Sequence, residues 1–224
     1  LRYEDALKGI PGSIVMQRDG LGRVRPSIDY PRQEPINGNE LLLTIDVTYQ
    51  SIVDEELKRG VEEQLAEGGL AIMMNPKTGE ILALSVYPNE NPNNLGAIDI
   101  SKFRNRVVSD LFEPGSVFKI VAAAAAYENK IVSPSDRFYA EHGTMKVVNN
   151  GKLVRIITDA HPSDWLTFQE AIEISSNIVF AKVSKLIGED RLYRMARDFG
   201  FGIITGIDMP GEVRGILKNP SEWS

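Results

Sequence analysis

A serine at the start of an apolar, alanine-rich segment constrains the fold of this chain more than any other feature. Pro114 and Gly115 come just before Ser116, and the run 120–127 that follows contains five consecutive alanines. Proline and glycine mark helix starts, and alanine has the highest helix propensity of any residue. The sequence therefore predicts a helix that begins beside Ser116. On that helix Lys119 would share a face with Ser116, with Cβ atoms about 5–6 Å apart.

This pair has the chemistry of a nucleophile with its own base. A serine hydroxyl attacks a carbonyl well only when a neighbouring group takes its proton, and a lysine does so where burial has lowered its pKa. The poorly hydrated surface of an alanine-rich helix suits that need, and the N–H groups at its N-terminus favour an oxyanion. Ser116 and Lys119 are therefore candidate catalytic residues. The alternative interpretation is a helix-capping serine beside a solvated lysine.

A second polar motif, Ser175-Ser176-Asn177, lies between two predicted helices. The run 167–170 has the pattern of a capping box and opens a short helix through Ile174, and the apolar run from Ile178 opens the next helix. Ser175 and Asn177 are thus expected at a helix–helix junction, where their side chains can point into a cleft. The alternative is a plain turn that ends the first helix.

These motifs resemble those of the transpeptidase domain of a class B penicillin-binding protein. That family combines Ser-x-x-Lys with a later Ser-x-Asn-type motif. The resemblance extends over residues 36–224 and is carried also by segments 39–50, 69–85, 104–116 and 199–212. It implies an α+β fold of the penicillin-binding protein and serine β-lactamase type, in which an antiparallel sheet packs against helices.

The resemblance also implies a function, that of a serine D,D-transpeptidase. In such an enzyme Ser116 would attack the carbonyl between the two terminal D-alanines of a peptidoglycan stem peptide, with Lys119 as the acylation base. Ser175 would relay a proton toward the departing amine, and Asn177 would position Lys119 and the substrate amide. β-Lactams would acylate Ser116 and block it. The resemblance implies no cofactor and no metal.

One departure from the family pattern concerns its third motif, Lys-Thr/Ser-Gly, which follows Ser-x-Asn in the chain. No such tripeptide follows Asn177. Lys77-Thr78-Gly79 has the right residues but precedes the nucleophile, and its apolar flanks predict a hairpin turn. We therefore expect a transpeptidase domain that is incomplete at its C-terminus, and 224 residues that are inactive by themselves.

The resemblance further predicts the domain organisation and the surroundings of the protein. Residues 1–35 would be the remnant and connector of a non-catalytic N-terminal pedestal, and residues 36–224 the N-terminal portion of the transpeptidase domain. The family's membrane anchor would place the protein in the bacterial cell envelope, on the extracytoplasmic face of the cytoplasmic membrane. Expected partners are stem peptides, β-lactam antibiotics, a membrane-embedded glycan polymerase and division proteins.

Composition excludes several classes of function. A net charge of −6 without a basic stripe argues against a nucleic-acid partner, and the absence of cysteine excludes disulfides and thiolate catalysis. Three other functions remain compatible with both motifs. They are a β-lactam sensor, a class D-type β-lactamase, and a non-catalytic envelope scaffold that keeps the fold as a docking module.

Local patterns predict the remaining elements. Apolar residues every four positions from Tyr49 to Leu65 indicate an amphipathic helix, and residues 70–74 and 80–87 indicate an antiparallel strand pair. Short strands are expected around residues 149–151, and Gly200 is expected to end a helix over 191–199. We also expect the alanine-rich helix to pack under the 70–87 strand pair.

Overall fold

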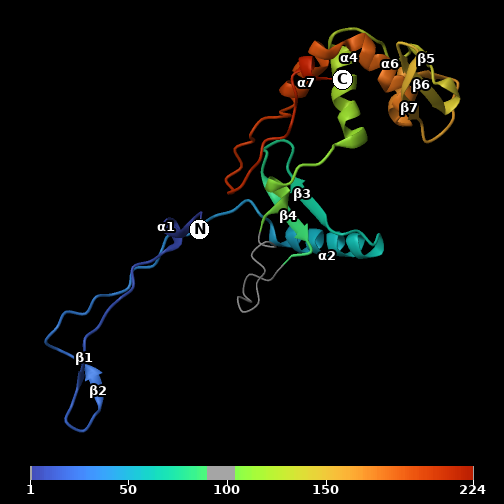
Figure 1. The fold of residues 1–224 in the computed structure, drawn as a ribbon. Helices are drawn as coiled ribbons and strands as arrows, with labels where there is room; N and C mark the ends of the chain where they lie inside the picture. Colours follow the sequence, from blue (N-terminus) through green and yellow to red (C-terminus); the bar gives the residue numbers. More distant parts are fainter. Residues whose placement is uncertain (1, 90–103, 224) are drawn as a thin grey trace. The chain divides into compact units, whose positions relative to one another are not determined.

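The computed structural model describes residues 2–89 and 104–223, which form two compact units (Figure 1). Unit 1 comprises Leu1–Ser109 with Asp208–Gly211, and unit 2 comprises Asp110–Ile207 with Glu212–Ser224. Helices and antiparallel strand pairs occur together, so the predicted α+β class is confirmed. In the described part of the chain, no helix is both long and apolar enough to cross a membrane.

The N-terminal part of unit 1 is a narrow, largely exposed ladder. Helix α1 (Glu4–Leu7) is followed by strands β1 (Met16–Arg18) and β2 (Val24–Pro26), which pair antiparallel. Nearly all its side chains are exposed, so this segment contributes little to a hydrophobic core. Its assignment as a pedestal remnant stays a prediction.

The rest of unit 1 is built on helix α2 (Val47–Glu63), which packs on a hairpin of β3 (Gly69–Met74) and β4 (Ile81–Tyr87); a short helix, α3 (Arg106–Ser109), follows. Asp46 caps α2, and Gln50 bonds both main-chain groups of Leu84 at 2.9 and 3.0 Å. The predicted extension of the helix to Leu65 is wrong. Leu65 lies beyond the last turn with φ +51° and is 92% exposed, because the chain turns there toward β3.

The tripeptide Lys77-Thr78-Gly79 forms the turn of the β3–β4 hairpin, as predicted. Asn75 holds the turn, since its carbonyl accepts from the Gly79 N–H and its side chain from the Lys77 N–H. Gly79 has φ +79°, a backbone conformation that favours glycine. The resemblance of this tripeptide to the family's third motif is therefore a coincidence of composition.

Unit 2 contains the two candidate motifs. Its regular elements, in chain order, are η3 (Gly115–Phe118), α4 (Lys119–Glu128), β5 (Arg137–Tyr139), η4 (Glu141–Gly143), β6 (Thr144–Asn149), β7 (Lys152–Thr158), β8 (Trp165–Thr167), α5 (Phe168–Glu173), α6 (Asn177–Ile187), α7 (Glu189–Asp198) and η5 (Pro220–Glu222). Strand β5 pairs with β8 and β6 with β7, both antiparallel. The hairpin predicted around residues 149–151 is thus confirmed.

The core of unit 2 forms where α4 packs against α6 and α7. Ala125 and Ala126 are fully buried in α4, as are Val179 and Val183 in α6. Small alanine side chains let the helix backbones approach closely, while Phe168 fills the neighbouring space with its ring 5.3 Å from that of Tyr127. The alanine run therefore makes α4 both a strong helix and a close-packed one. Its packing under the β3–β4 pair would join the two units and stays a prediction.

Helix α7 begins two residues and ends one residue earlier than predicted, and Gly200 lies just past its end, as predicted. Gly200 follows the helix with φ +87°, the left-handed conformation of a residue just past a helix end. At the other end, Gly188 adopts φ +81° between α6 and α7. This glycine separates the two helices and allows α7 to begin at Glu189.

Candidate active site

Ser116 lies in the short 3-10 turn η3, directly before α4. Gly115 has φ +58° and so takes the left-handed backbone that the turn into η3 requires. The Lys119 N–H donates to the Ser116 carbonyl, so a single turn links the two residues. The Ser116 side chain is exposed, and no described residue forms a hydrogen bond with its hydroxyl. This hydroxyl is therefore open to an incoming group.

Lys119 joins α4 to the bend before α6. Its Nζ donates to the Ser175 carbonyl at 2.5 Å, to Ser175 Oγ at 2.8 Å and to Asn177 Oδ1 at 2.7 Å. These three bonds use all the donors of an ammonium group. The structure thus brings Lys119, Ser175 and Asn177 together, and it places Ser116 one turn before Lys119. Among the described residues, no side-chain hydrogen bond joins Ser116 to Lys119, Ser175 or Asn177.

Burial changes the acidity of the Lys119 amine. Partial removal from water lowers the pKa of Lys119, because it disfavours the charged form, while the nearby negative charge of Asp159 acts in the opposite direction and raises it. Nζ also lies 5.6 Å from the centre of the Phe180 ring, a cation–π contact that favours the charged amine. The net pKa is below the ordinary lysine value, as a general base requires.

The bend at residues 175–177 has a fixed backbone. Ser175 adopts φ +57°, and the buried Ser176 caps α6 by accepting from the Val179 N–H at 3.1 Å. Before it, the predicted capping box is present, since Thr167 and Glu170 exchange hydrogen bonds at the start of α5. The predicted helix–helix junction is therefore confirmed, and its cap turns Ser175 and Asn177 toward Lys119.

Asp159 holds the bend from the other side and was missed by the sequence analysis. It accepts from Ser176 Oγ at 2.6 Å and from the Ile178 N–H at 3.1 Å. Its neighbour Thr158 accepts from Asn177 Nδ2 at 2.7 Å through its carbonyl. The end of β7 thus fixes both Asn177 and the serine beside it. A carboxylate just after a predicted strand was the only signal for Asp159, and that signal did not show which segment the carboxylate would meet.

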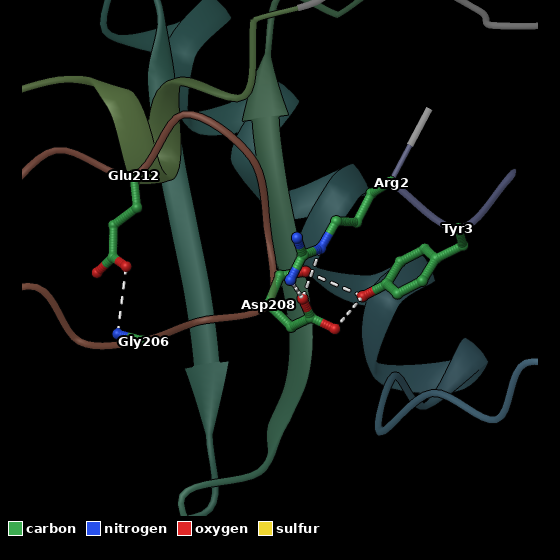
Figure 2. Close-up of polar contacts among 5 residues, drawn as sticks. All are labelled: Arg2, Tyr3, Gly206, Asp208 and Glu212. Carbon is green, nitrogen blue, oxygen red and sulfur yellow. Dashed lines mark hydrogen bonds and ion pairs between the residues drawn. The ribbon is translucent and has the colours of Figure 1, made fainter. Parts of the chain in front are cut away.

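In unit 2, Glu212 fixes the loop that follows α7 (Figure 2). Its carboxylate accepts from the Thr205 N–H and hydroxyl, both at 2.6 Å. It also accepts from the Gly206 N–H at 3.2 Å, the bond that Figure 2 shows. These bonds lower the pKa of Glu212. Sequence analysis identified this segment only through its resemblance, and the structure gives its glutamate a clear structural role.

In unit 1, Asp208 is held by the N-terminal segment (Figure 2). Arg2 Nε donates to Asp208 Oδ1 at 2.7 Å, and the Tyr3 hydroxyl donates to Asp208 Oδ2 at 2.9 Å. Hydrogen bonds from Arg2 and Tyr3 lower the pKa of the Asp208 carboxyl group. The start of the chain therefore contacts a segment more than two hundred residues later.

Metal-ligating side chains do not gather anywhere in the described residues: no group of three histidine, aspartate or glutamate side chains is placed to hold an ion. The Nδ1 atom of His142 lies in close contact with the Asp164 carboxylate beside the β5–β8 strand pair.

Comparison with known proteins shows the family to which the chain belongs. Residues 69–224 match the family model of the penicillin binding protein transpeptidase domain. Among curated relatives, Stage V sporulation protein D of Bacillus subtilis is 36% identical, with 96% of this chain and 33% of that protein aligned. The probable peptidoglycan D,D-transpeptidase PenA of Neisseria meningitidis is 33% identical, with 100% of this chain and 37% of that protein aligned.

A solved structure gives the same result for the fold. The transpeptidase domain of penicillin-binding protein 3 from Burkholderia pseudomallei matches with a TM-score of 0.67 at 30% identity, over 81% of this chain and 49% of that one. The chain belongs to the penicillin-binding protein transpeptidase domain family, and the resemblance to class B members is confirmed. It spans about a third of the length of the curated relatives that it matches.

Proposed function

We propose that the protein is a serine D,D-transpeptidase that cross-links peptidoglycan. The observation that carries the proposal is that the partly buried Lys119 lies one turn from the exposed Ser116. The Lys119 amine also bonds Ser175 and Asn177 of the second motif. The names of the relatives agree, since PenA of Neisseria meningitidis is called a probable peptidoglycan D,D-transpeptidase. Peptidoglycan stem peptides and β-lactams are the ligands that this function requires.

In the first half of the reaction, Ser116 Oγ attacks the carbonyl between the two terminal D-alanines. Lys119, in its neutral form, takes the hydroxyl proton, and N–H groups at the start of α4 stabilise the oxyanion. The C–N bond then breaks, and the terminal D-alanine leaves with a proton delivered to its amine. The product is an ester between the Ser116 oxygen and the shortened stem peptide.

Ser175 is suited to carry that proton. A hydroxyl both accepts and donates, so Ser175 Oγ, 2.8 Å from Lys119 Nζ, accepts from the ammonium while its own hydrogen is free for the leaving amine. Asn177 Oδ1 keeps the amine in place during the transfer. In the second half, an amine from a neighbouring strand attacks the ester, gives up a proton, and releases Ser116 as a hydroxyl.

We further propose the surroundings that this reaction needs. Cross-linking occurs in the cell envelope, outside the cytoplasmic membrane, where a glycan polymerase supplies new strands and division proteins would direct the enzyme. The proposal extends to these partners because a transpeptidase needs freshly polymerised substrate.

Labelling of the full-length protein with a fluorescent penicillin tests this function. We expect one label per protein, no label in Ser116→Ala, and a strongly slowed reaction in Lys119→Ala. Ser109→Ala, in the short helix α3, is a matched control that keeps the label. Absence of label in the unmodified protein would exclude the proposed enzyme and favour a non-catalytic scaffold. Adduct decay within seconds would favour a β-lactamase.

A further inference from the structure

A groove runs along β7 and ends at Asn177. Its volume is about 390 Å³, and it lies within unit 2. The residues that line it are four consecutive residues of β7 and one residue of the candidate site: Arg155, Ile156, Ile157, Thr158 and Asn177. Because Asn177 also bonds Lys119, the groove leads directly away from the candidate catalytic amine.

The groove follows a strand edge whose main-chain groups are available. Among the described strands β7 pairs only with β6. Along an antiparallel strand, the main-chain groups of successive residues point to opposite edges. The Thr158 carbonyl points to Asn177, while the Asp159 N–H points to Gly143 on the β6 side. Ile156 therefore directs its N–H and C=O into the groove, where an extended peptide can pair with them.

The groove also carries an uncompensated positive charge. Arg155 is exposed, and none of the described residues forms a hydrogen bond or an ion pair with its side chain. Across the strand pair it stands opposite Val147, which offers no charge. A guanidinium in this setting is suited to a carboxylate, which it can bind through two parallel hydrogen bonds.

We infer that this groove is a substrate subsite that holds an extended, acidic segment of the stem peptide, with Ile156 pairing to its main chain and Arg155 binding its carboxylate. The inference rests on the proposed transpeptidase function. A strand advances about 3.3 Å per residue, so Arg155 lies roughly 10 Å along β7 from the position of Thr158 beside Asn177. The carboxylate is therefore about three residues away from the peptide group that Asn177 contacts.

A charge-removing variant with a matched control tests the subsite. The variant is Arg155→Gln, and the control is Lys152→Gln, which removes an exposed positive charge from the same strand outside the groove. The substrates are a synthetic stem pentapeptide with a free carboxylate on its second residue and the same peptide with that group as a carboxamide. In the full-length protein we expect a higher kcat/KM for the acidic peptide. Arg155→Gln reduces this preference about 3- to 10-fold, whereas Lys152→Gln leaves it unchanged.

A binding measurement adds a readout that a purely structural role would not change. In full-length Ser116→Ala, we expect the acidic peptide to slow hydrogen exchange of the Ile156 amide. Equal preference for the two peptides in all proteins, or unchanged exchange at Ile156, would overturn the subsite. Fluorescent penicillin labelling of the same samples separates the two hypotheses: labelled protein without peptide preference contradicts the subsite alone, and unlabelled protein contradicts the proposed function.

Discussion

Replacing Asp159 by asparagine separates two roles that the structure gives to this residue. The carboxylate accepts from Ser176 Oγ at 2.6 Å and from the Ile178 N–H at 3.1 Å, and its charge opposes the effect of burial on Lys119. Asparagine has nearly the same shape, but it carries no charge and has only one acceptor oxygen. The substitution therefore weakens the bend before α6 and removes the group that raises the pKa of Lys119.

The two effects differ in magnitude and in the assay that detects them. Loss of a charge-assisted hydrogen bond to the buried Ser176 costs about 1–2 kcal/mol of unfolding free energy. Thermal or denaturant unfolding of Asp159→Asn against the unmodified protein measures that loss.

The second effect appears in the pH dependence of penicillin acylation. Lys119 acts as a base only when neutral, so the rate rises with pH through its pKa. Without the negative charge of Asp159 that pKa falls further, and the rising limb moves to lower pH. Asp164→Asn, at a carboxylate paired with His142, is the control and leaves the limb in place. A limb that stays or moves to higher pH in Asp159→Asn would refute the electrostatic reasoning.

Three further predictions concern single positions. Gly115→Ala places a Cβ at φ +58°, so we expect about 1 kcal/mol lower stability by denaturant unfolding and slower Ser116 acylation; an unchanged protein would show that the turn does not need glycine. Ala126→Leu overpacks the fully buried face of α4 and should cost about 1–3 kcal/mol, whereas Ile120→Leu, at an exposed position of the same helix, should cost less than about 0.5 kcal/mol. The hydrogen bond from the Thr167 N–H lowers the pKa of Glu170. The ionised Glu170 carboxylate therefore stabilises the fold above its ordinary pKa, and this stabilisation is lost as pH falls through the lowered pKa. Glu170→Gln should flatten that acid-side loss in a thermal melting series, and an identical pH profile would contradict it.

Features set by neighbouring residues could be predicted from the sequence. The capping box at Thr167 and Glu170, the turn at residues 77–79 and the helix end at Gly200 all depend on a few adjacent side chains and on glycine geometry. The Lys119 contact with residues 175–177 was expected from two motifs and from the resemblance, since periodicity alone cannot bring distant segments together. The sequence therefore predicts Ser116, Lys119, Ser175 and Asn177 as one site only because both motifs occur together in the family.

Features that depend on the ends and partners of elements could not be predicted. Leu65 continues the apolar period of α2, but the period carries no information about where the chain turns. Asp159 meets Ser176 only because the β6–β7 pair returns the chain to the start of α6. The groove at Arg155 depends on the same return, so no local pattern indicated it.

Titration of the Lys119 amine tests most directly whether Lys119 can act as the base for Ser116. The Cε resonance of Lys119 in the full-length protein, assigned by comparison with Lys119→Arg, reports the protonation of Nζ. A midpoint below 10.5 is the predicted result, because burial outweighs the charge of Asp159. A midpoint at or above 10.5 would mean that the amine stays charged, and it would contradict Lys119 as the base that activates Ser116.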